Sequence, residues 1–255
     1  MNAPPAARSP ARAVVRRGRV AVHFDYAALP REDAAQFAAL TMRGLRELEN
    51  LADLPARVRL RFVLSADTRI SSARGHTIHL PVYRVLARTA PYLHEIAHVL
   101  LPCLRAPAWF SEGLAGYLEA AVSERGAGYD SHLFTPGGNA EVHVDAARWL
   151  ADPRGQSVLP FVGTRGTPPR ILADRHNVAA PFYVLSHSLV KFVADQAGLP
   201  CVVHLTRAVK FPAAVRRLTG KPASAWRASW LGALRAAAPS LNLREDGTRA
   251  ADRAP

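Results

Sequence analysis

The stretch TAPYLHEIAHVLLPCLRAPAWFSEGLAGYLE, residues 89–119, decides the fold, because it joins two helix-forming segments that are rich in metal-binding residue types. His94 and His98 are four positions apart, so on a helix their side chains lie within about 40° of each other and can bind one ion. Glu95 lies about 100° from His94 around that helix, which suits contact with a water on the ion better than direct ligation. The pattern predicts a metal site in which ligands and base are different residues.

A catalytic zinc site needs a third protein ligand, and Glu112 within WFSEGLA is the candidate. Pro102 ends the first helix, and a second helix that begins near Pro107 can bring Glu112 back to the metal after a short loop. Glu119 lies on nearly the same face of the second helix, so it is a rival ligand or an outer acceptor for a ligand imidazole.

Two glycines, Gly113 and Gly116, follow Glu112 in the second helix. Each lowers helix propensity by about 1 kcal/mol relative to alanine, so a packing reason for them is expected. We expect the glycines to permit a close approach between the second helix and the helix of the two histidines.

Regular patterns on both sides of this stretch predict an α+β fold. Alternation of apolar and polar residues predicts strands at 19–26 and 57–65, and apolar spacings of three and four predict a helix over 31–51. His76 to Leu80 is predicted as the edge strand, where it would hold a substrate backbone in extended form. These elements form an N-terminal mixed sheet lobe with the active-site helix, residues 19–101.

The rest of the chain is predicted to be a helical lobe, residues 102–237, within one catalytic domain over 19–237. Helices are expected at 107–122, 181–196, 201–209, 213–218 and 223–236. Residues 123–180 are rich in glycine, proline and charge, and are interpreted as an irregular segment over the cleft. Residues 1–18 are expected to be a disordered basic arm, and 238–255 a disordered tail.

Composition excludes several classes of protein. The formal net charge is +13, but the basic residues are mostly arginines spread along the chain, which disfavours nucleic acid as the main partner. Two cysteines in 255 residues do not make a disulfide framework. No apolar run is long enough for a membrane span or a secretory signal, so a cytoplasmic location is expected. The oligomeric state is left open.

HEIAH followed by WFSEGLAGYLE resembles the gluzincin metallopeptidases, in particular a bacterial peptidase-MA-like group that reads HExxH and then W-x-x-E-G-x-A. The order of elements before HEIAH and the later FYVLS also resemble that group, so the similarity covers about residues 18–236. The resemblance implies a zincin-like metallopeptidase fold, with one Zn²⁺ per chain held by His94, His98 and Glu112. The second histidine and the glutamate are closer in this sequence than in better-known gluzincins.

The predicted reaction is hydrolysis of a peptide bond in a peptide or protein substrate, with Glu95 as general base. Tyr183 and His187 are four apart on the predicted helix 181–196, and either could donate a hydrogen bond to the oxyanion, as in similar zinc peptidases. Three alternatives remain open: a zinc hydrolase of a non-peptide amide, a catalytically silent zinc-binding domain that binds a partner, and a basic nucleic-acid-binding protein.

Overall fold

A five-stranded mixed sheet forms the N-terminal part of the computed structural model, which describes residues 12–25, 27–129, 135, 137–168 and 178–236. The strand order is β1-β2-β3-β5-β4. The strands β2, β3 and β5 are parallel to one another, and β1 and β4 run antiparallel at the two edges. The bounds are β1 Arg12–Arg17, β2 Val20–Asp25, β3 Leu60–Ser65, β4 Ser72–Arg74 and β5 Thr77–Pro81.

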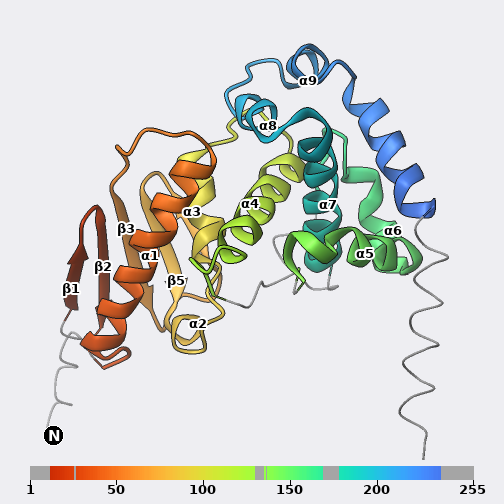
Figure 1. Ribbon diagram of the computed structural model, residues 1–255. Coiled ribbons are helices and arrows are strands. Elements are labelled where there is room, and N and C mark those ends of the chain that lie inside the picture. The colour runs from red at the N-terminus through yellow and green to blue at the C-terminus, as the bar shows by residue number, and fades with distance from the viewer. Residues whose placement is uncertain (1–11, 26, 130–134, 136, 169–177, 237–255) are drawn as a thin grey trace, which may run out of the picture.

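One face of the sheet is covered by α1 (Arg31–Leu51), which lies across the strands (Figure 1). Alternate residues of β2 and β3, such as Phe24 and Phe62, are buried against it. The Phe62 ring meets the Phe37 ring of α1 edge-on at a centroid distance of 5.4 Å. Burial of each large apolar side chain contributes about 1.5–3 kcal/mol, so this interface holds the strands and the helix together. The predicted strands at 19–26 and 57–65 and the helix at 31–51 are confirmed.

The two edges of the sheet differ from the prediction. The segment from His76 to Leu80 is not an edge strand, because β5 pairs with β3 on one side and with β4 on the other. The short strand β4 is the edge beside the later helices. A strand of three residues is too short to give a visible alternation in sequence, which is why it was missed.

The expected disordered arm over 1–18 is wrong for residues 12–17, which form β1 and pair with β2. Ala13 is buried against the core and Arg16 is exposed, as in an edge strand with one wet face. The segment was predicted to be disordered because it is rich in arginine, and its alternation of buried and exposed residues is not evident from its composition. Residues 1–11, like the predicted tail at 238–255, lie outside the described residues.

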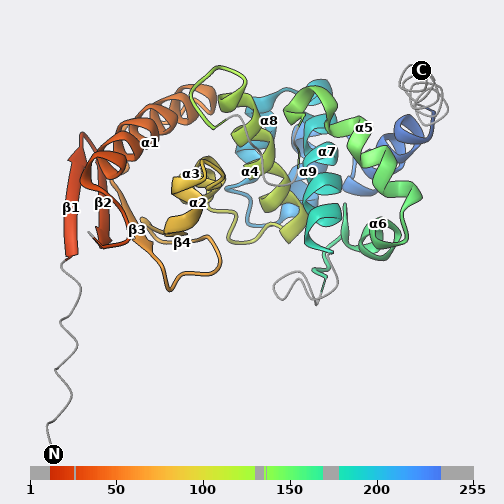
Figure 2. The same ribbon diagram turned by 90° about the horizontal axis from the view of Figure 1, so that it is seen from below.

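The rest of the described chain is helical, so the sheet stands beside a larger group of helices (Figures 1 and 2). The helices and the one 3-10 turn are α2 Val82–Leu86, α3 Tyr92–Leu100, α4 Ala108–Ser123, α5 Gly138–Ala151, α6 Pro153–Val158, η1 Leu159–Phe161, α7 Ala179–Ala197, α8 Leu199–Leu205, α9 Phe211–Thr219 and a last helix over 223–236.

The interpretation of 123–180 as irregular is wrong over α5, α6 and η1. Val142 and Ala146 are completely buried, and they lie one turn apart on the face that α5 packs against α7. The glycines at 137 and 138 mark the start of this helix and not a long loop. Residues 130–134, 136 and 169–177 of the segment lie outside the described residues.

The close approach permitted by Gly113 is to α7 and not, as expected, to α3. A side-chain carbon at Gly113 would collide with the backbone carbonyl oxygen of Ser186 and come within 2.8 Å of Val190. At Gly116 the same carbon would lie 3.4 Å from the His187 ring, an ordinary contact. Gly113 is therefore the position that sets the distance between α4 and α7.

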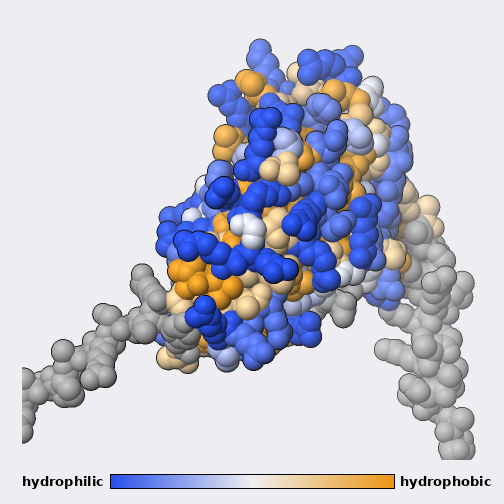
Figure 3. Space-filling model, turned by 60° about the vertical axis from the view of Figure 1, so that its left-hand side comes forward, coloured by the Kyte–Doolittle hydropathy of each residue, from blue (hydrophilic) through white to orange (hydrophobic). Residues whose placement is uncertain are grey.

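The surface seen from the sheet side is mostly hydrophilic, with hydrophobic residues scattered among the polar ones (Figure 3). Within the described part of the chain, we find no helix with the length and apolar character that crossing a membrane requires.

Candidate metal centre

Two helices bring His94, His98 and Glu112 together. The site helix α3 packs against α1 and the strands β4 and β5, and the Tyr92 ring meets the Phe37 ring of α1 at 5.6 Å. The chain then turns after Leu100 and returns in α4, which packs beside α3. The return is short, so Glu112, in the second turn of α4, faces the two histidines of α3.

One atom from each of the three residues forms a compact triangle. His94 Nε2 lies 3.1 Å from Glu112 Oε2 and 3.0 Å from His98 Nε2, and His98 Nε2 lies 3.3 Å from Glu112 Oε2. Within the described chain these residues are the group whose ligand atoms could share one ion. The structure thus brings together the three ligands expected from the sequence.

The triangle fits zinc in both donor type and size. Imidazole nitrogen and carboxylate oxygen are the usual ligands of catalytic zinc, at about 2.0–2.2 Å from the ion. Ligand atoms at that distance from a tetrahedral centre lie about 3.3–3.6 Å apart. The observed separations of 3.0–3.3 Å lie at or slightly below the lower limit of this range, so a small adjustment would accommodate the ion.

The second ring nitrogen of each histidine faces an outer residue. His98 Nδ1 lies 3.4 Å from Ser111 Oγ, and His94 Nδ1 lies 3.9 Å from Glu119 Oε2. Partners of this kind orient metal-binding imidazoles and select their tautomer. Glu119 is therefore on the far side of His94 from the triangle, in the outer position that the sequence left open.

Charges in the site are strongly coupled because the groups are buried. Burial opposes the charged form of His94, but the hydrogen bond and negative charge of Glu112, with Glu119, outweigh it and raise the His94 pKa to about 9. Burial also opposes ionisation of Glu112, yet its contacts with both histidines lower its pKa well below the usual value. For Glu119 burial dominates and raises the pKa to about 7. A positive charge within the triangle is therefore favoured by its surroundings.

Glu95 lies next to His94 in the first turn of α3 and is buried, at 7% exposure. Burial raises its pKa, and the neighbouring histidines lower it to a smaller extent. A carboxylate in such surroundings binds a proton more readily than one in water.

Tyr183 and His187 of α7 occupy different surroundings. The Tyr183 ring lies 5.7 Å from the His94 ring, so it borders the metal triangle. His187 is 1% exposed, and its Nε2 pairs with Asn139 Oδ1 of α5 at 2.7 Å. Asn139 Nδ2 in turn donates to the carbonyl of Tyr117 in α4. His187 thus belongs to a buried link between three helices.

Sequence reasoning missed Ser111 and Asn139. Ser111 could have been found, because it immediately precedes Glu112 in the returning helix. Asn139 offered no such signal, since it comes from a segment interpreted as irregular.

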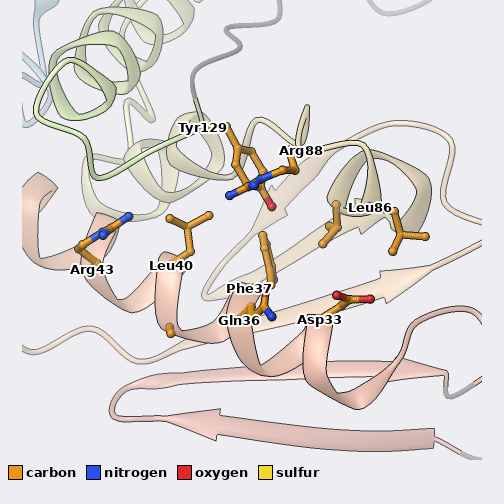
Figure 4. A pocket seen from close by; sticks show the side chains of 10 residues that line it. Asp33, Gln36, Phe37, Leu40, Arg43, Leu86, Arg88 and Tyr129 are labelled. Carbon is orange, nitrogen blue, oxygen red and sulfur yellow. The ribbon is translucent and has the colours of Figure 1, made fainter.

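A pocket of about 540 Å³ lies elsewhere, between α1, α2 and the chain after α4 (Figure 4). Arg43, Arg88, Asp33 and Tyr129 are among the residues that line it. None of the residues of the metal triangle reaches this pocket, so it is separate from the candidate centre.

No protein-family description matches the sequence, and no curated protein matches it significantly. Solved structures do. A mutant of an M1 zinc metallopeptidase from Deinococcus radiodurans, bound to a Tyr-Ser-Ala substrate, matches with a TM-score of 0.52 at 18% identity, over 87% of this chain and 51% of its own. The same metallopeptidase in another crystal structure matches with a TM-score of 0.51 at 16% identity and equal coverage.

These similarities establish the fold. The chain has the α+β, zincin-like fold of an M1 metallopeptidase domain, with an N-terminal mixed sheet and a C-terminal group of helices. It spans about half the length of the solved structures that it matches. The predicted fold class is confirmed.

Proposed function

We propose that this protein is a zinc-dependent metallopeptidase of the gluzincin type, similar to the peptidase-MA-like group, with one Zn²⁺ per chain. The observation that carries the proposal is the triangle of His94 Nε2, His98 Nε2 and Glu112 Oε2, with sides of 3.0–3.3 Å. The M1 metallopeptidase fold supports it, because that fold accompanies zinc peptidase chemistry in the solved structures.

His94, His98 and Glu112 would hold the ion, and a three-ligand site leaves a position for water or substrate. Zinc in such a site lowers the pKa of a bound water and polarises a carbonyl group. Glu95 accepts the proton of the attacking water at its carboxylate and passes it to the leaving amine. Its burial favours the protonated form that this transfer requires.

Tyr183 is the better candidate for the oxyanion donor. Its ring borders His94, whereas the Nε2 of His187 is engaged with Asn139. A donor placed beside the developing negative charge acts chiefly in the transition state. The outer edge of β4, which lies beside α3, replaces β5 as the strand that would hold an extended substrate backbone.

The decisive experiment is Glu95→Gln, measured for both zinc content and cleavage of a diverse peptide library. Zinc content should stay at one ion per chain while cleavage almost vanishes, because Glu95 moves a proton and does not hold the ion. Glu32→Gln, on an exposed position of α1, is the matched control and should cleave like the wild type.

Cleavage by Glu95→Gln at the wild-type rate would refute the proposed mechanism. Zinc binding without cleavage by the wild type, on peptides and on non-peptide amides, would favour the silent zinc-binding domain. Cleavage of the non-peptide amides alone would show that the substrate is a non-peptide amide, and the proposed roles of the residues would stay the same.

A further inference from the structure

Three basic side chains meet in one pocket near the start of α4. The pocket has a volume of about 680 Å³, and Arg105, Arg165 and Lys210 line it. These residues come from three separate segments: the α3–α4 loop, the chain after η1 and the residue before α9. The fold, and not local sequence, brings the three charges together.

Among the residues of this pocket that the structure describes, none is acidic. Some basic side chains elsewhere are paired with a carboxylate, as Arg19 is with Glu49 and Lys191 is with Asp195. Over the described ranges, Arg105, Arg165 and Lys210 form no ion pair. A hollow lined by charges of one sign concentrates its electrostatic potential and attracts the opposite charge. The pocket therefore suits an anionic group.

The start of α4 connects the pocket wall to the candidate metal centre along the chain. Pro107 lines the pocket, and its carbonyl accepts hydrogen bonds from the backbone N–H groups of Phe110 and Ser111. Ser111 contacts His98 and precedes Glu112. Five residues, about 7.5 Å along the helix axis, separate Pro107 in the pocket wall from the proposed ligand Glu112. An extended peptide covers about 3.3–3.6 Å per residue, so two or three residues bridge this distance.

Aromatic packing fixes the pocket relative to the metal centre. Phe211, the first residue of α9, lines the pocket and packs against Phe110 of α4 at a ring distance of 4.8 Å. It also meets the Trp109 ring at 6.2 Å. Lys210 directly precedes Phe211, so its backbone is held beside the helix that carries Glu112. The exposed side chain of Val209, at 67%, adds an apolar surface to the rim.

We propose that this pocket is a substrate subsite for a carboxylate group located two or three residues from the scissile bond. The inference rests on the proposed peptidase function and adds a substrate preference to it. The carboxylate comes either from an Asp or Glu side chain or from the end of the peptide chain. Both sources present the same charge to Arg105, Arg165 and Lys210.

The test measures binding of matched, fluorescently labelled peptides to the zinc-loaded Glu95→Gln protein, together with kcat/KM for the wild type. The peptides contain Glu or Gln at each position within three residues of the cleaved bond, with a free or an amidated C-terminus. We expect the carboxylate form to bind about ten-fold more tightly, because each of three exposed ion pairs should strengthen binding about two-fold. The preference should weaken in high salt.

Arg105→Gln, Arg165→Gln and Lys210→Gln, each made in the Glu95→Gln background for binding, should reduce this preference about two-fold each and abolish it together. Binding of the neutral peptides should stay unchanged. Arg43→Gln is the matched control, because Arg43 lines the pocket of Figure 4, where Asp33 also contributes to the wall. This control should keep the full preference.

If affinity differs only between peptides with a free and an amidated C-terminus, the bound carboxylate is the end of the peptide chain. If affinity differs between the Glu and Gln peptides, the bound carboxylate is a side chain. A preference that survives in the triple variant, or no preference in the wild type, would overturn the proposal. Failure of the peptidase function is distinguishable, because it would appear as absent cleavage of neutral and anionic peptides alike.

Discussion

The helix α4 contacts α3 through a polar side chain, and it contacts α7 at a position that has no side chain. Toward α3, Glu112 presents a carboxylate oxygen 3.1 Å from His94 Nε2 and 3.3 Å from His98 Nε2. Toward α7, Gly113 presents no side chain, and the backbone of Ser186 occupies the space. The two residues are adjacent in sequence and about 100° apart around the helix.

The difference separates two kinds of constraint on one helix. At the α3 face the type of atom would matter, because the proposed zinc ion binds only certain donor atoms. At the α7 face only size matters, because α7 must come close enough to bring Tyr183 beside His94. Substitutions on the two faces should therefore fail in different ways.

The largest effect is expected at the α3 face, for Glu112→Ala compared with Glu119→Ala. Removing one of three metal ligands should nearly abolish zinc binding, whereas losing an outer partner typically costs about 10–100-fold in affinity. Competition with a chromophoric chelator measures both affinities. The reverse order would assign the third ligand to Glu119, and equal affinities would remove the distinction between the two.

The next largest effect is expected for Tyr183, which the close packing of α7 places beside His94. Tyr183→Phe should lower kcat by about 10²–10³ with unchanged zinc content and nearly unchanged KM, because an oxyanion donor stabilises the transition state. Tyr83→Phe, an exposed tyrosine of α2, serves as the control. An unaffected kcat would transfer the role to His187 or to neither residue.

The smallest effect concerns size alone, in Gly113→Ala against Gly116→Ala. The first should destabilise the protein by about 1–3 kcal/mol, because the new carbon meets backbone and not a movable side chain. The second should be neutral or stabilise by up to about 1 kcal/mol, because alanine is a better helix former and the nearest contact is 3.4 Å. Urea unfolding measures both. Equal stabilities would show that α4 and α7 can separate without cost.

The sequence predicted the structure correctly where the spacing of apolar residues matched the buried face of a single strand or helix. Alternation in β2 and β3 and the spacing of apolar residues in α1 predicted the sheet lobe, and the HEIAH and WFSEG segments predicted the metal triangle. The turn between α3 and α4 is short, so only a few residues of α4 could reach the two histidines as a third ligand.

The sequence was misleading at the glycines, because the same residue type can allow close helix packing, begin a helix or form a loop. Glycines beside a metal ligand suggested contact with the helix of the other ligands, but the neighbour was α7, which is distant in sequence. The helix α5 begins at a pair of glycines and was interpreted as a loop, although Val142 and Ala146 carry a helical spacing. Ser111 and Asn139 act through contacts that only the folded chain creates.

The strand β1 has a consequence for how copies of this protein meet. A sheet edge is a template for another strand, and β1 is the longer of the two edges. Arg16 and Arg17 are exposed on it, so two copies aligned along this edge would bring like charges together. Arginines that resemble an unstructured arm in the sequence therefore protect the sheet from extension into an aggregate.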